Sequence, residues 1–96
     1  MRPRKPADIE KALLKKGFVK DATSHHAYYH LKVDGKITGV QTYLSHGKKS
    51  KEYGRSLMSE VKGQLGFIDT KKAEAFLDCP MTHNQYVEML KELKTI

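Results

Sequence analysis

The sequence predicts an α+β domain with a three-stranded antiparallel sheet, a helix before it, a long helix after it and two C-terminal helices. Three observations support this fold class. Asp34 and Gly35 form the strongest short-range signal for a two-residue hairpin turn. Apolar residues recur at helical spacing before and after the hairpin. The length of 96 residues allows one modest core and excludes two. We therefore expect residues 1–96 to form a single domain.

The first element is predicted to be a helix over residues 6–16, preceded by a loose arm at residues 1–5. Pro6 suits the first helical turn, where its missing N–H has no cost. Gly17 is a natural residue to end the helix, and a short strand is expected at about 18–22. The residues that share the apolar face of this helix are Ile9, Ala12, Leu13 and Lys16.

The hairpin is predicted to have strands at about 26–33 and 36–44. A turn at Asp34 and Gly35 pairs Val33 with Lys36, and the same register sets Tyr29 opposite Val40, His26 opposite Tyr43 and His25 opposite Leu44. Since side chains alternate between the two faces, one face is expected to enter the core. Its members are Ala27, Tyr29, Leu31, Val33, Val40 and Leu44. The opposite face collects His26, Tyr28, His30, Ile37, Gln41 and Tyr43.

Three helices are predicted after the sheet. The first spans 51–65, with an apolar stripe of Tyr53, Leu57, Met58, Val61 and Leu65. Asp69 can cap a short helix that contains Ala73, Ala75, Phe76 and Leu77. Thr82 and Gln85 form a capping box for a last helix at 83–94. The stripe of that last helix is Tyr86, Met89, Leu90 and Leu93.

Composition narrows the classes of partner. The net charge is +7 and the pI is near 9.5. Such a charge favours binding to nucleic acid, to an anionic membrane surface or to an acidic protein, although a charge that only keeps the protein soluble also explains it. The single Cys79 excludes an internal disulfide and is typical of a reducing cytoplasm. There is no apolar run long enough to span a bilayer, so we expect a cytoplasmic protein with no membrane partner.

The histidines are the candidate catalytic groups. On one face of the predicted sheet, His25 and His46 lie diagonally across from each other at the open end. Imidazoles titrate near neutrality, and cleavage of RNA by transesterification needs a base, an acid and cations near phosphorus. The cations follow directly in the chain and are Lys48, Lys49, Lys51 and Arg55. The structural alternative is that His25 caps a strand, His46 sits in a loop and the lysines are merely solvated.

The sequence suggests one further binding site and argues against a metal site. Tyr28 and Tyr43 on the exposed face can stack on unpaired bases, or they can form an ordinary cross-strand pair or pack under the C-terminal helices. A metal site is not expected, because adjacent His25 and His26 point to opposite faces and the spacing matches no zinc pattern. We expect no cofactor.

Several short motifs resemble the HicA family of small toxins from toxin–antitoxin systems. They are an opening helix, Gly17-Phe18-Val19, Ser24-His25-His26-Ala27-Tyr28, Thr42-Tyr43-Leu44-Ser45-His46-Gly47, and a helix ending Gln64-Leu65-Gly66. The resemblance implies an αβββα fold like that of double-stranded-RNA-binding domains. It also implies a metal-independent ribonuclease that cleaves mRNA and is neutralised by a HicB antitoxin.

The resemblance covers residues 7–66, which leaves residues 67–96 as a C-terminal helical extension. The catalytic histidine of the family maps onto His25, with His26 as a rival, and a later Pro-x-His turn maps onto residues 44–46. The chain departs from the family at Thr23, where a glycine is usual, and at Leu44, where a proline is usual. Two other functions remain open: a non-catalytic RNA-binding module on the same fold, and a basic protein-interaction domain.

Overall fold

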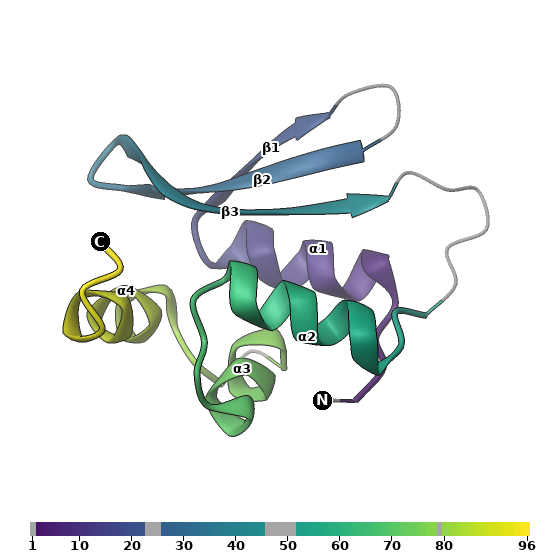
Figure 1. Ribbon diagram of the computed structural model, residues 1–96. Helices are drawn as coiled ribbons and strands as arrows, with labels where there is room; N and C mark the ends of the chain where they lie inside the picture. The colour runs from purple at the N-terminus through teal and green to yellow at the C-terminus, as the bar shows by residue number, and fades with distance from the viewer. Residues whose placement is uncertain (1, 23–25, 46–51, 79) are drawn as a thin grey trace.

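The computed structural model describes residues 2–22, 26–45, 52–78 and 80–96. Within them lie three strands and four helices, in the order that the sequence predicts (Figure 1). The elements are α1 Pro6–Lys15, β1 Phe18–Ala22, β2 His26–Val33, β3 Lys36–Ser45, α2 Arg55–Gln64, α3 Thr70–Leu77 and α4 His83–Glu92. The predicted α+β class and element order are therefore confirmed.

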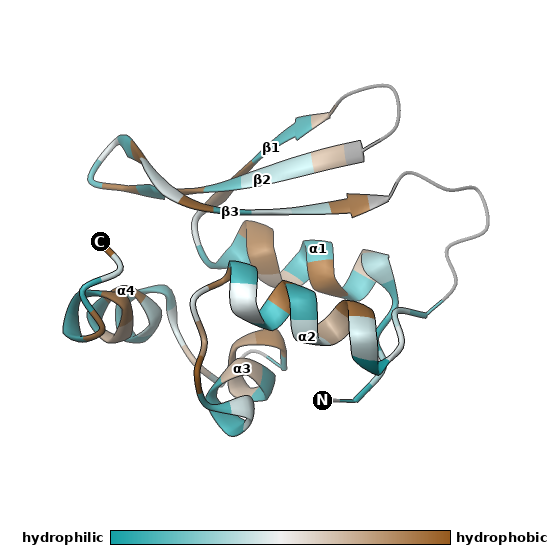
Figure 2. Ribbon diagram, in the orientation of Figure 1, coloured by the Kyte–Doolittle hydropathy of each residue, from teal (hydrophilic) through white to brown (hydrophobic). Residues whose placement is uncertain are grey.

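The sheet is open and antiparallel, with strand order β1-β2-β3. Helices α1 and α2 lie side by side against one of its faces. Helix α3 lies on the far side of these two helices, and α4 lies beside them, on the same side of the sheet (Figure 1). Hydrophobic and hydrophilic residues alternate along each helix, as expected for helices with one buried side (Figure 2). None of the described helices covers the opposite face of the sheet.

The predicted core face of the hairpin is confirmed. Its fully buried members are Ala27, Tyr29, Leu31, Val40 and Leu44. Val33 is partly buried against the same core, and Thr42 joins them with only 1% of its surface exposed. The turn is also confirmed, because Asp34 and Gly35 have φ values of 52° and 78°. Positive φ at both central residues is what a type I′ hairpin turn requires.

The predicted register holds only next to the turn. Val33 pairs with Lys36, but beyond a bulge His30 pairs with Gln41 and Tyr29 with Thr42, not with Val40. The expected pairing of His26 with Tyr43 is wrong as well, since the terminal pair joins His26 to Ser45.

A hydroxyl group stabilises the bulge. Thr38 Oγ1 donates to the Leu31 carbonyl at 3.0 Å and accepts from the Val40 amide at 3.2 Å. Gly39 lies in the middle of this stretch, and glycine within a strand is typical of a bulge. The bulge moves the pairing of β3 against β2 by two residues. Because side chains alternate with a period of two, every side chain keeps its predicted face.

A polar network lies beneath the sheet, where α1 meets β1 and β2. The Tyr29 hydroxyl donates to Glu10 Oε2, and Lys20 Nζ lies 2.8 Å from the same oxygen. Burial, and then the neighbouring Glu10 carboxylate, raise the pKa of Tyr29. The phenol therefore stays protonated as a hydrogen-bond donor at any physiological pH.

Helix α2 begins later than expected. The sequence predicts a helix over 51–65, but α2 starts at Arg55. The physical reason is that Tyr53 is held in an extended bridge with Arg4, through amide-to-carbonyl bonds of 3.2 and 2.7 Å. Gly54 then serves as the N-cap with extended backbone. The predicted burial is right for Met58, Val61 and Leu65 and wrong for Leu57, which is 45% exposed. Tyr53 is buried as expected, but it lies before the helix and not on its stripe.

The predicted helix starts in the C-terminal extension are confirmed. Asp69 caps α3 by accepting from the amides of Lys71 and Lys72. Thr82 and Gln85 form the expected capping box of α4, with both hydrogen bonds present. Of the residues predicted to form the apolar stripe of α4, Leu93 is 41% exposed, so that part of the prediction is wrong. Val87, which was not predicted, is buried.

The extension packs into the main core through aromatic rings. Phe76 lies with its ring centroid 6.2 Å from that of Phe18, 5.5 Å from Phe67 and 4.6 Å from Tyr86. The Tyr86 hydroxyl, whose pKa burial raises, donates to the Leu65 carbonyl at 2.6 Å. The extension therefore shares one core with the αβββα part.

The end of α1 makes the second junction with the extension. Buried Lys16 donates from Nζ to the Phe76 carbonyl at 2.8 Å, and its ammonium lies 4.9 Å from the Phe76 ring centre. His83 Nδ1 contacts the Lys16 carbonyl at 2.7 Å. A carbonyl only accepts, so Nδ1 carries the proton. The imidazole packs against Gly17, where a Cβ would lie 2.6 Å from Nδ1.

Candidate nucleic-acid interface

The end of the sheet that carries the candidate histidines is defined by one backbone pair. β2 begins at His26 and β3 ends at Ser45, and these two residues are paired. His25 and His46 lie outside the described residues, and of His26 the structure describes the backbone. In sequence, however, a histidine is the next residue outward on each side of this terminal pair.

The exposed face of the sheet carries the two candidate stacking residues. Tyr28 pairs directly with Tyr43, and their ring centroids lie 5.8 Å apart at an interplanar angle of 43°. They form the expected cross-strand aromatic pair. The alternative that they pack under the C-terminal helices is wrong, because α3 and α4 lie on the same side of the sheet as α1 and α2, opposite this exposed face (Figure 1).

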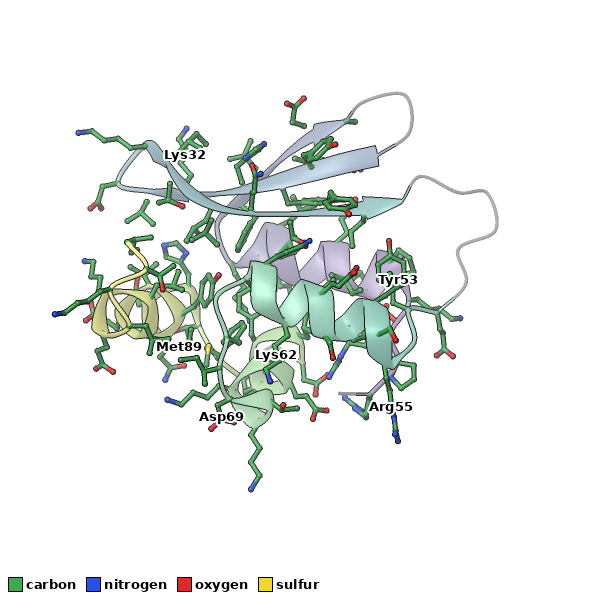
Figure 3. The ribbon with its side chains drawn as sticks, in the orientation of Figure 1. Lys32, Tyr53, Arg55, Lys62, Asp69 and Met89 are labelled. Atoms are coloured by element: carbon green, nitrogen blue, oxygen red, sulfur yellow. The ribbon has the colours of Figure 1, made fainter. Side chains whose placement is uncertain are left out.

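This face still offers surface to a partner. Tyr43 is 44% exposed, and Val19 on β1 and Ile37 on β3 are exposed to a similar or greater degree. Lys32 lies on the same side of the sheet, away from the helices (Figure 3). An aromatic pair with an exposed ring is able to stack on an unpaired base.

The start of α2 is a second cationic feature. Gly54 provides no side-chain cap, and the first turn contains no acidic residue. The first amides of a helix lack intrahelical acceptors and carry partial positive charge. Arg55 adds a full charge there and points away from the sheet (Figure 3).

The other predicted phosphate-binding residues, Lys48, Lys49 and Lys51, lie outside the described residues. They were expected at or before the first turn of a helix that starts at 51. Because the N-cap is Gly54, Arg55 is the member of the predicted set that lies in the first turn.

The N-terminal arm is a feature that sequence reasoning missed. The prediction of a loose arm is wrong for residues 2–5. Arg2 and Arg4 both bind the Asp78 carboxylate, Arg2 with contacts of 2.8 and 2.7 Å, and both also approach Glu74. A signal was present, because Arg2 and Arg4 alternate at the two-residue period that sets both side chains on one side of an extended segment.

These contacts change the electrostatics of Asp78. The Arg4 guanidinium, and after it that of Arg2, hold the pKa of the Asp78 carboxyl below its ordinary value. The side chain of Arg4 is 9% exposed, and its buried Nε has no hydrogen-bond partner among the described residues. The arm is thus fixed on one side by Asp78 and on the other by the backbone bridge to Tyr53.

The arm, the outward face of α1 and the end of α3 enclose an open groove of about 470 Å³. Its charged lining is mostly cationic and includes Arg2, Arg4, Lys5, Lys11 and Lys15. Asp8, Glu52 and Asp78 also line it. No residue of this groove was singled out from the sequence as a site.

In the described ranges, no group of three or more His, Cys, Asp or Glu side chains is arranged to hold a metal ion. In the same part of the chain, no helix is long and apolar enough to cross a membrane.

Comparison of the chain with family models, with curated proteins and with solved structures finds no match.

Proposed function

We propose that this protein is an RNA-binding protein of the HicA type, a metal-independent endoribonuclease with a fold like that of double-stranded-RNA-binding domains. The observation that carries the proposal is the terminal pair of His26 with Ser45, because His25 and His46 follow it outward in sequence, one on each side. The order α1-β1-β2-β3-α2, with both helices on one face of an antiparallel sheet, also supports it.

The chemistry assigns a role to each group. His25 acts as the general base or acid at the 2′-hydroxyl or the leaving oxygen, and His46 assists as its partner in proton transfer. His26 is the alternative to His25. The cations Lys48, Lys49, Lys51 and Arg55 bind the phosphate and stabilise the charge that develops on it. Tyr28 and Tyr43 stack on bases of the substrate.

The partners follow from the same proposal. The substrate is RNA, and a HicB-like antitoxin is expected to neutralise the activity. A short acidic reading frame next to this one would supply that antitoxin. The protein is proposed to act in the cytoplasm, where its mRNA substrate is found.

A non-catalytic RNA-binding module is the second candidate, favoured by the Tyr28–Tyr43 pair, in which Tyr43 is exposed. Base stacking and phosphate contacts bind RNA without any catalytic residue. A basic protein-interaction domain is the third reading, and it would be favoured by a failure to bind RNA or DNA at low salt.

A cleavage assay tests the proposal. Wild-type protein, His25→Ala and His83→Asn are incubated with mixed-sequence RNA in the presence of EDTA. His83→Asn is the matched control, because it changes a histidine at the α1–α4 junction and keeps an N–H for the Lys16 carbonyl. We expect cleavage by the wild type and the control only. Cleavage by His25→Ala at the wild-type rate would refute the role of His25, and RNA retention without cleavage by any form would favour the binding module.

A further inference from the structure

The groove between the N-terminal arm, α1 and α3 is the strongest feature that the proposed function does not use. Its volume of about 470 Å³ lies within the range of ligand sites, roughly 300–1,000 Å³. Part of its wall, Leu77 and Asp78, comes from the end of α3, in the extension beyond residues 7–66.

The charges of the groove fall into two groups. The guanidinium groups of Arg2 and Arg4 are already paired with the carboxylates of Asp78 and Glu74. The charges of these four side chains therefore cancel, and Arg2, Arg4 and Asp78 of this cluster line the groove. Arg4 is the most buried of them and is also fixed through its backbone.

The second group supplies the excess positive charge. Lys5, Lys11 and Lys15 line the groove together with the acidic residues Asp8 and Glu52. Lys11 and Lys15 are four residues apart on α1, which places them on one face of the helix, and both are exposed. Asp8 lies in the first turn of α1, where the helix dipole stabilises an acidic side chain.

The groove is also continuous with the proposed active region. The backbone bridge between Arg4 and Tyr53 joins the arm to the segment that leads into α2. Arg55 follows two residues after Tyr53, at the end of the molecule where the N-terminus lies (Figures 1 and 3). Glu52 lines the groove, so a polyanion bound at the start of α2 lies next to the groove and can extend into it.

We propose that this groove binds the phosphate backbone of the RNA strand outside the cleavage region, with Lys11 and Lys15 as the contacting cations. This inference rests on the proposed function. The Arg2–Asp78–Arg4 cluster holds the wall in place and is not itself the ligand site. The extension helps to form the groove, because Leu77 and Asp78 at the end of α3 belong to its wall.

The test measures binding without cleavage. The probe is a fluorescein-labelled, single-stranded 2′-O-methyl RNA of mixed sequence, which has no free 2′-hydroxyl for transesterification. Its affinity is measured by fluorescence anisotropy over a range of salt concentrations. The groove variant is Lys11→Glu/Lys15→Glu, and the control is Lys71→Glu/Lys72→Glu at the other end of α3. Both variants change the net charge equally, so a general charge effect affects them alike.

We expect the groove variant to bind the probe at least tenfold more weakly than the control does. Its salt dependence should be shallower than that of the wild type by roughly 1.4 in log–log slope, since two phosphate contacts to a single strand are lost. If circular dichroism shows that either variant is unfolded, Lys→Gln pairs at the same positions replace both variants.

The failures of the two proposals differ. A wild type that does not bind the probe at low salt overturns the proposed function, and the groove proposal with it. A wild type that binds the probe, with equal losses in the groove variant and the control, overturns the groove proposal alone. A poly-glutamate peptide of matched charge that competes as well as the RNA overturns the assignment to RNA and indicates an acidic protein partner.

Discussion

Replacement of Phe76 by alanine tests whether the C-terminal extension is part of the core. Phe76 has no exposed surface, and its ring contacts the rings of Phe18, Phe67 and Tyr86. Truncation of a buried phenylalanine costs about 3–5 kcal/mol of unfolding free energy. Small domains have about 5–15 kcal/mol in total, so this loss is a large fraction. It corresponds to a fall in Tm of roughly 12 °C or more.

Urea unfolding, followed by far-UV circular dichroism and by tyrosine fluorescence, measures the effect. The chain has five tyrosines and no tryptophan, so tyrosine emission is not masked. Leu93→Ala is the matched control, because Leu93 is 41% exposed and its truncation should change stability by about 0.5 kcal/mol or less. A loss below about 1 kcal/mol for Phe76→Ala, or separate transitions for the two probes, would refute a shared core.

Two further predictions concern the contacts of Gly17 and of Asp78. Gly17→Ala should lower the free energy of unfolding by about 1–3 kcal/mol, because Gly17 has a φ of 91° and the new Cβ would meet the His83 ring. In a His83→Ala background the same substitution should lower the free energy of unfolding by less, and equal losses in both backgrounds, measured by urea unfolding, would refute the contact. Asp78 contributes stability above its unfolded pKa, near 3.8, and this contribution is lost as the pH falls through the lower folded value. When the pH is lowered from 5 to 2, the Tm of the wild-type protein should therefore fall more than the Tm of Asp78→Asn. Equal falls in Tm would contradict a stabilising Arg2–Asp78–Arg4 cluster.

Local patterns in the sequence were sufficient to predict most of the fold. The turn at Asp34 and Gly35, the cap at Asp69 and the capping box at Thr82 depend on neighbouring residues only, and all three are confirmed. The core face of the hairpin was predictable because a shift of two residues preserves the alternation of side chains. The bulge that causes the shift depends on Thr38 and Gly39, which a uniform hairpin register ignores.

Features that depend on distant parts of the chain were not predictable in the same way. The bridge between Arg4 and Tyr53 joins residues 49 positions apart in sequence, and it both orders the arm and delays the start of α2. The ion pair between Arg2 and Asp78 joins residues 76 positions apart. Burial of Lys16 was indicated by its place on the apolar face of α1, but its acceptor on Phe76 was not.

The cationic groove has the same origin as these long-range contacts. Its charges come from the arm, from α1 and from the end of α3, which no single stretch of sequence brings together. The predicted site, by contrast, came from one stretch around the hairpin, and it awaits a direct test of chemistry.

The measurement that tests the central claim most directly is the single-turnover rate of RNA cleavage, with EDTA present and protein in excess, for wild type and His25→Ala. Both forms are first shown to bind the RNA with equal affinity. General acid–base catalysis by one side chain contributes typically about 10²–10⁴-fold, so His25→Ala should be at least 100-fold slower. A wild type that binds RNA but forms no product, or a variant that cleaves as fast as the wild type, would contradict the account.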